Sequence, residues 1–501
     1  MNTTHVFGRG PFGDAVQRPV WWIVAVGLVS VAAGFVISRD LPLLLIGYVI
    51  VAAGVALLAF TRPEYAAAVL LVINWGNFGD VLIRYHGLPS IVKPLVALLF
   101  LVVIVQRFGP RRKPLVSDPV IWCVLAYVLI TALGLLYARY TGRVEYELVE
   151  LLKDTVTFFI LINLLGSRAA FERMVWMLLA VGALLGTLAV YQEITKTYDW
   201  NYGGLALNAV AQIAEGMSNR ARAAGTIGDP NFFGQQLVVL VPLGLWAALN
   251  GRTWRGKFFG AYATLACLAG IGLSFSRGAY LATIVVLVLY AMYVKLDPRY
   301  LLVLPLIGAL LWVAPPEFRA RFDTLDEIIP GANLTGTYND DSIQGRSVKI
   351  AVGLAMFGDH PFLGVGRGNY RLYYPDYIRR LGGAQYDTQR DAHNLYLGLA
   401  AEQGLLGLAA FGGLIATAIW RIRRARRWFS YAGEQRMADL SVALIVGFAG
   451  YLVTAIFLHG AYLFFLWLQL AMIVAMATIA RGEAAGEAWE RVTARSTVIG
   501  I

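Results

Sequence analysis

A polar stretch from Phe318 to Gly407 interrupts an apolar chain, and near its end Asp391-Ala392-His393-Asn394-Leu395 leads into a long apolar run. Hydrophobic residues make up 58% of the 501 positions and charged residues only 15%. A soluble domain of this length would expose more charge, so the composition predicts an all-α, polytopic integral membrane protein. The polar stretch is then a large loop between two membrane helices, expected over residues 316–393. Its tyrosines at 370, 373, 374 and 377 favour an ordered cap over a disordered linker.

Apolar runs of nearly spanning length recur along the whole chain. They are Val20–Ile37, Pro42–Phe60, Tyr65–Val81, Ser90–Gln106, Pro119–Tyr137, Val149–Leu165, Arg173–Ile194, Phe232–Asn250, Phe258–Phe275, Ala279–Val294, Tyr300–Ala314, Asn394–Trp420, Leu440–Leu458 and Ala461–Ala480. A spanning helix needs roughly 20 apolar residues and several runs are shorter, so we expect about 12 to 14 spans.

Lysine and arginine clusters in the short loops predict the orientation. They follow the fourth, eighth, tenth and twelfth runs: Arg107, Arg111, Arg112 and Lys113; Arg252, Arg255 and Lys257; Lys295 and Arg299; and Arg421, Arg423, Arg424, Arg426 and Arg427. Cytoplasmic loops are rich in such residues, so both termini (1–19 and 481–501) are predicted to be cytoplasmic and the odd-numbered loops extracytoplasmic. The net charge of +11 then reflects membrane orientation, and nucleic acid is an unlikely partner.

This topology places the notable polar residues on the extracytoplasmic side. Arg222, Arg277, Arg346 and His393 fall in odd-numbered loops, and Lys93 and Lys153-Asp154 lie near the outer ends of two runs. Both lysines could snorkel to the membrane interface, or they could line a vestibule shared with the other residues.

The arginines suggest binding of a phosphorylated group. Guanidinium groups match phosphate oxygens bidentately and keep their charge, so in a low-dielectric vestibule they could stabilise a diphosphate leaving group. Arg277 lies in the tight turn Ser276-Arg277-Gly278, where it could equally anchor a hairpin. Arg222 opens a glycine-rich loop to Gly234 that contains the helix-capping candidates Asp229 and Asn231. That loop could bind phosphate at a helix N-terminus or be a plain capped turn.

His393 is the candidate for proton transfer. Its imidazole could take the proton from an attacking hydroxyl, with Asp391 orienting it or itself acting as the base. The alternative is a histidine without a catalytic role that lies beside a helix cap made by Asn394 or Asp391. The two cysteines, Cys123 and Cys267, lie in apolar runs and indicate packing, so no metal site is expected.

Several short motifs together resemble the O-antigen ligase and polymerase superfamily of membrane glycosyltransferases. They are Arg222-Ala-Ala-Gly-Thr with Asp229-Pro-Asn-Phe-Phe-Gly234, Ser276-Arg277-Gly278-Ala279, Gly345-Arg346-Ser347, Pro361-Phe-Leu-Gly-Val-Gly366, His393-Asn394-x-x-Leu397 and Glu402-x-Gly404-Leu-Leu-Gly407. The resemblance covers residues 222–407, which are expected to form the catalytic region. It is flanked by membrane helices over 20–221 and 394–480.

The resemblance implies an enzyme of the bacterial inner membrane. It would move a glycan from undecaprenyl diphosphate to a hydroxyl of the lipid A core on the periplasmic face, with inversion and without metal, nucleotide or other cofactor. Arg277 and Arg346 would bind the diphosphate, assisted by Arg222, Lys93 and Lys153. His393 would activate or position the acceptor, supported by Asp391 and Asn394.

Other functions remain open from the sequence. A polymerase would perform the same transfer onto another lipid-linked repeat unit. A flippase or transporter of lipid-linked sugars would place ionisable groups near the bilayer midplane, whereas this chain places them near the outer rim. A scaffold without chemistry would not need the glycine-flanked arginines.

Overall fold

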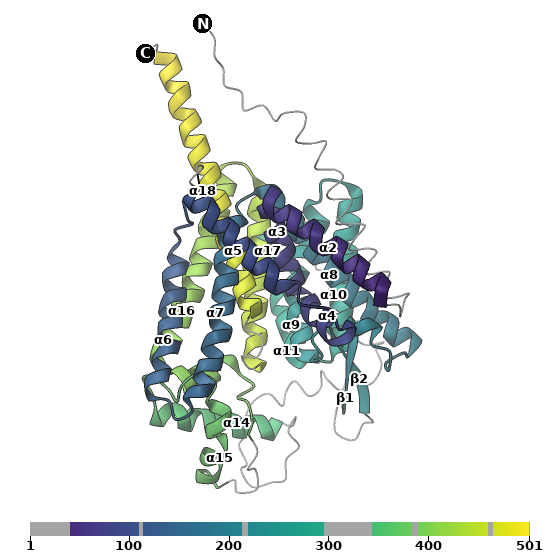
Figure 1. The fold of residues 1–501 in the computed structure, drawn as a ribbon, viewed down its shortest axis with the longest axis vertical. Coiled ribbons are helices and arrows are strands. Elements are labelled where there is room, and N and C mark those ends of the chain that lie inside the picture. Colours follow the sequence, from purple (N-terminus) through teal and green to yellow (C-terminus); the bar gives the residue numbers. More distant parts are fainter. Residues whose placement is uncertain are drawn as a thin grey trace.

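The structure is a computed structural model, and it describes residues 41–109, 114–212, 219–294, 343–382, 389–458 and 464–499. Helices dominate these ranges (Figure 1). They are α2 (Leu41–Thr61), α3 (Pro63–Trp75), α4 (Phe78–His86), α5 (Val92–Phe108), α6 (Pro119–Tyr137), α7 (Thr141–Leu164), α8 (Arg168–Thr195), α9 (Pro230–Asn250), α10 (Trp254–Ser274), α11 (Arg277–Val294), α14 (Ile343–Asp359), α15 (Tyr370–Arg380), α16 (Leu395–Tyr431), α17 (Gln435–Thr454) and α18 (Phe464–Ile499).

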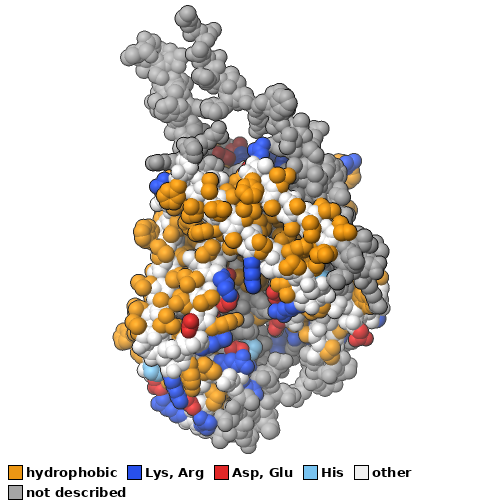
Figure 2. All heavy atoms as spheres, viewed as in Figure 1, with side chains coloured by type: hydrophobic (Ala, Val, Ile, Leu, Met, Phe, Trp, Pro, Cys, Tyr) orange, Lys and Arg blue, Asp and Glu red, His pale blue; other side chains and the backbone are white. Residues whose placement is uncertain are grey.

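The multi-pass helical class is confirmed. Within the described ranges, 8 helices are long and apolar enough to cross a membrane, or up to 9 if the bent pair α3–α4 counts as one span. The expected runs Val20–Ile37 and Tyr300–Ala314 lie outside the described residues. Figure 2 draws one face of the molecule. Hydrophobic side chains cover the half of that face nearer the C-terminus, and charged side chains surround a hollow in the other half.

Ion pairs join residues of several even-numbered loops at one end of the bundle. Asp118 caps α6 and pairs with Arg421 of α16 at 2.7 Å and with Arg481 of α18 at 3.2 Å. At the same end, Arg168 at the start of α8 pairs with Glu434, which precedes α17, at 2.6 Å. Arg252 lies 3.8 Å from Glu172, which also contacts Arg168, so the described basic residues of the eighth and twelfth loops lie at this same end.

The odd-numbered loops meet at the opposite end, where α14, α15 and a β-hairpin lie (Figure 1). The hairpin pairs β1 (Leu207–Gln212) with β2 (Asn219–Gly225) in antiparallel register. It carries Arg222, so the sequence expectation of a loop at this position was wrong. The strands were missed because they are short and rich in Ala, Asn and Arg, which give little strand signal.

The run Tyr65–Val81 does not form one straight helix. The chain breaks after Trp75, Asn77 takes a left-handed conformation with φ 53°, and α4 leaves α3 at 60°. The Asn77 amide donates to the carbonyl of Thr226 beyond the hairpin at 3.0 Å. A polar residue at the break thus joins α3 and α4 to the end of the molecule that carries the hairpin.

Helices α14 and α15 form an ordered cap at this end. Val348, Val352 and Met356 of α14 pack against Tyr370, Tyr374, Tyr377 and Ile378 of α15 in a small buried cluster. The aromatic residues thus bury apolar surface, as expected from the sequence, and this burial orders the cap.

Candidate active site

A break in α16 provides the surface on which the segment before α15 docks. Gly404 interrupts the 37-residue helix with φ 60° and ψ −157°, a conformation open almost only to glycine. The segment 361–366 docks against this break through four backbone hydrogen bonds. They run from Leu405 to Pro361 (2.8 Å), from Leu406 to Phe362 (3.2 Å), from Val365 to Ala401 (2.9 Å) and from Gly366 to Glu402 (2.8 Å), donor named first.

Glycines allow this close approach of two backbones. A Cβ at Gly404 would lie 2.4 Å from the carbonyl carbon of Phe362, and one at Gly364 would lie 2.2 Å from that of Glu402. Gly368, with φ 77°, lies against the side chains of Arg143 and Glu147 of α7. The glycine pattern of residues 364–368 therefore places Arg367 between α7 and α16.

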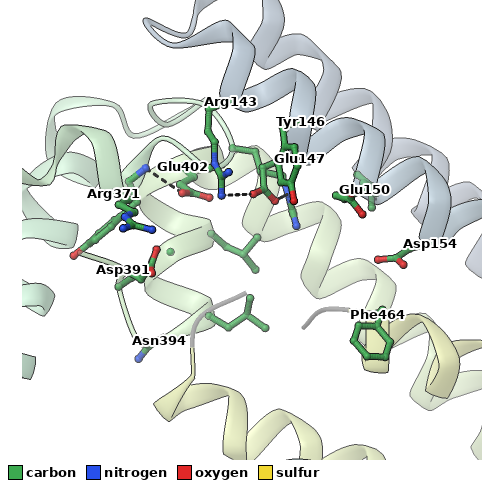
Figure 3. A pocket seen from close by; sticks show the side chains of 18 of the residues that line it. Arg143, Tyr146, Glu147, Glu150, Asp154, Arg371, Asp391, Asn394, Glu402 and Phe464 are labelled. Atoms are coloured by element: carbon green, nitrogen blue, oxygen red, sulfur yellow. Dashed lines mark hydrogen bonds and ion pairs between the residues drawn. The ribbon is translucent and has the colours of Figure 1, made fainter. Parts of the chain in front are cut away.

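A cavity of about 440 Å³ opens between the start of α7, this segment, α15 and the start of α16. Its charged lining residues are Glu147, Glu150, Asp154, Asp391 and Glu402, with Arg143, Arg367 and Arg371. Tyr146, Phe464 and Trp467 add aromatic surface. Figure 3 shows Asp391 and Glu402 on one side of this space and Glu150 and Asp154 on the other.

Part of this charge is already paired within the protein. Arg143 pairs with Glu147 at 2.9 Å (Figure 3), and Arg367 lies 3.6 Å from the same carboxylate. Glu402 accepts a hydrogen bond from the backbone N–H of Tyr370 at 3.0 Å. These contacts fix one wall of the cavity.

Arg367 is the most buried of the cavity's arginines, only 8% exposed. It donates to the Tyr127 hydroxyl of α6. Burial alone would lower the pKa of its guanidinium, but Tyr127, Glu147 and Glu402 outweigh burial and raise that pKa. The guanidinium thus stays charged, as arginine does in proteins.

Two of the predicted site residues line this cavity. Asp391 and Asn394 lie on its wall (Figure 3). Asn394 caps α16, because its Oδ1 accepts from the Leu397 N–H at 3.0 Å, which is one of the two caps considered from the sequence. His393 lies between them, exposed and in a left-handed conformation with φ 47°. Histidine tolerates this conformation better than most residues.

Arg222 and Arg277 lie together at the turn between α10 and α11. Arg277 is the first residue of α11 and is half-buried. Arg222 is buried, and its Nε donates to the Ser274 carbonyl at 3.0 Å. A second nitrogen of Arg222 lies 3.4 Å from the Phe275 carbonyl. Arg222 therefore holds the residues that immediately precede Arg277.

The remaining predicted residues lie on three different helices. Arg346 is in the first turn of α14, and its side chain lies outside the described part of the structure. Lys93 is exposed in the first turn of α5. Lys153 of α7 is exposed and pairs at 2.7 Å with Glu150, which lines the cavity. In the described ranges, no group of three His, Cys, Asp or Glu side chains is arranged to hold a metal ion.

The sequence also contained signals for residues that were not chosen. Arg367 lies between two glycines, much as Arg277 and Arg346 each have a glycine neighbour, and this pattern could have selected it as a candidate. Arg143 and Arg371 gave no signal, because they lie far apart in the sequence, on α7 and α15, and come to the same cavity only in the folded protein.

The O-antigen ligase family model matches residues 262–412, from within α10 to within α16. This range contains Arg277, Arg346, Arg367, His393 and Glu402. A search of curated proteins gives no match. The resemblance seen in the motifs is thus confirmed over this part of the chain, and it supports a glycosyltransferase of the ligase or polymerase type.

Proposed function

We propose that the protein transfers a glycan from undecaprenyl diphosphate to an acceptor hydroxyl at the outer face of the bacterial inner membrane. The family match over residues 262–412 carries this proposal. The structure supports it through a cavity at the end of the bundle opposite the basic loops, bordered by Asp391 and Asn394. The positive-inside rule assigns that end to the extracytoplasmic side.

The arginines would act on the donor. Arg277 and Arg346 would bind the diphosphate and neutralise the charge that develops as the glycosidic bond breaks. Lys93 and Lys153 would add positive charge at the membrane level. Because Arg222 is bonded to the carbonyls of Ser274 and Phe275, we assign it to positioning Arg277.

His393 would act on the acceptor. Its exposed ring beside the cavity could accept the proton of the attacking hydroxyl or hold that hydroxyl in place, with Asp391 nearby in the same turn. Attack by the hydroxyl on the anomeric carbon forms the new glycosidic bond as the bond to the diphosphate breaks. A single displacement inverts that centre.

The acceptor decides between two activities of the same site. We favour a ligase that uses the lipid A core, because His393-Asn394 and Gly345-Arg346 resemble that branch of the family. The alternative is a polymerase whose acceptor is a second lipid-linked repeat unit, and the family match includes both types.

Three substitutions test the assigned residues. Arg277→Ala, Arg346→Ala and His393→Ala are each expected to abolish transfer while the protein still inserts and folds. Arg346→Lys should rescue poorly, since an ammonium lacks the forked geometry of a guanidinium. Arg84→Ala is a matched control, because Arg84 is an exposed arginine on α4 whose one ion pair among the described residues is with Asp80 of its own helix at 3.1 Å. Near-normal transfer by two of the three variants would refute the assignment.

A further inference from the structure

The cavity holds more negative than positive groups, which is unexpected for a phosphate site. Five carboxylates and three guanidinium groups line it. Two of the guanidiniums, those of Arg143 and Arg367, already face Glu147. A diphosphate placed here would meet several carboxylates in a partly desolvated space, where like charges repel strongly.

Three charged side chains of the lining remain available to a ligand. Within the described residues, Asp154, Asp391 and Arg371 have no hydrogen-bond or ion-pair partner, whereas the other charged groups of the lining do. Figure 3 shows Asp391 and Asp154 on opposite sides of the cavity. Two acceptors and one donor that converge on a space of about 440 Å³ fit a small ligand rich in hydroxyl groups.

Aromatic side chains complete the lining. Trp467 and Phe464 of α18 and Tyr146 of α7 are among the lining residues. A pyranose ring has an apolar face that packs on an aromatic ring and hydroxyl groups at its edge that bond to carboxylates. Pockets that combine apolar surface with a few convergent polar groups bind such ligands.

We propose that this cavity is the subsite for a sugar ring of the acceptor glycan, and that it selects a neutral or amino sugar over an acidic one. Asp154 and Asp391 accept hydrogen bonds from hydroxyl or ammonium groups, and Arg371 donates to a ring or hydroxyl oxygen. The diphosphate of the donor binds outside the cavity, at the neighbouring arginines. This assignment rests on the proposed transferase function.

The test is a binding series with sugars that differ in charge. Purified protein in lipid nanodiscs is titrated by calorimetry with tetrasaccharides of glucosamine, of N-acetylglucosamine and of galacturonic acid, and with inorganic pyrophosphate. We expect the first two to bind and the uronate to bind at least tenfold more weakly. Pyrophosphate should not compete with either sugar.

Two variants assign the effect to the cavity. Asp154→Asn and Asp391→Asn should each weaken binding of the glucosamine tetramer by about tenfold, the loss of one charged hydrogen bond. Arg371→Gln should weaken binding of the galacturonic acid tetramer further. Glu145→Gln is the matched control, because Glu145 is exposed on α7 and lies outside the lining. All variants are checked for unchanged thermal unfolding.

The outcomes separate this proposal from the proposed function. Equal affinity for the acidic and amino sugars, or displacement of sugar by pyrophosphate, would overturn the acceptor subsite even if glycan transfer is observed. Sugar binding with the expected charge order in a protein that transfers no glycan would refute the transferase and retain the sugar site.

Discussion

Replacement of Gly404 by alanine should damage the site without touching any charged residue. Gly404 lies at φ 60° and ψ −157°, and an alanine Cβ there would meet the Phe362 backbone at 2.4 Å. The backbone strain costs about 1–3 kcal/mol. If the segment 361–363 moves away, its two hydrogen bonds from Leu405 and Leu406 are lost at about 1 kcal/mol each. The total is about 3–5 kcal/mol.

The change can be measured locally and globally. Hydrogen exchange should show lost protection at the amides of Leu405 and Leu406, which donate to the carbonyls of Pro361 and Phe362, and denaturant unfolding in micelles should show the lower stability. Glycan transfer should fall because Arg367 and Gly368, which line the cavity, would be displaced. Gly412→Ala is the control, since a Cβ at that position of α16 meets nothing within 4 Å. Identical exchange and stability in the two variants would refute this account of the break.

Two further predictions concern the two ends of the molecule. Arg421→Met should destabilise the protein by about 3 kcal/mol, because the Asp118 side chain is fully buried and would keep, among the described residues, only Arg481 as an ionic partner. A loss below about 1 kcal/mol in denaturant unfolding would contradict this. In the cap, the hydrogen bonds from Arg380 and Tyr377 lower the pKa of Asp359. This contact therefore stabilises the fold fully above about pH 4, the ordinary pKa range of an aspartate. The stabilisation is lost as the pH falls through the lowered pKa. Arg380→Gln should therefore lower stability by at most about 1 kcal/mol at neutral pH and not at all at a pH below that lowered pKa. A difference that persists there would show that the effect is not ionic.

The sequence predicted the helices well because membrane helices are long and apolar. Runs such as Pro119–Tyr137 agree with α6 at both ends. One helix cap was also predicted: Asp229 accepts from the N–H groups of Asn231 and Phe232 at the start of α9, as expected. The placement of the described basic loops, the eighth and the twelfth, at one end followed from their charge alone.

The bends in the helices and the cavity depend on contacts between segments that are distant in the sequence. The bend at Asn77 requires the carbonyl of Thr226, and the break at Gly404 requires the backbone of residues 361–363. The cavity forms because the segment 361–369 packs against α7 and docks on the break in α16. No local pattern in the sequence contains that information, so Arg143, Arg371 and Glu402 could not be selected as lining residues from spacing alone.

The most direct test is a transfer assay with purified protein and an undecaprenyl-diphosphate-linked oligosaccharide, with and without a lipid A-core acceptor and with a chelator present. A product that forms only when the lipid A core is added, and that is lost in His393→Ala, is the predicted result. A ladder of lengthened lipid-linked glycan without that acceptor would show the polymerase instead. Absence of any transfer from this donor to either acceptor, by protein that is folded and inserted, would contradict the central claim.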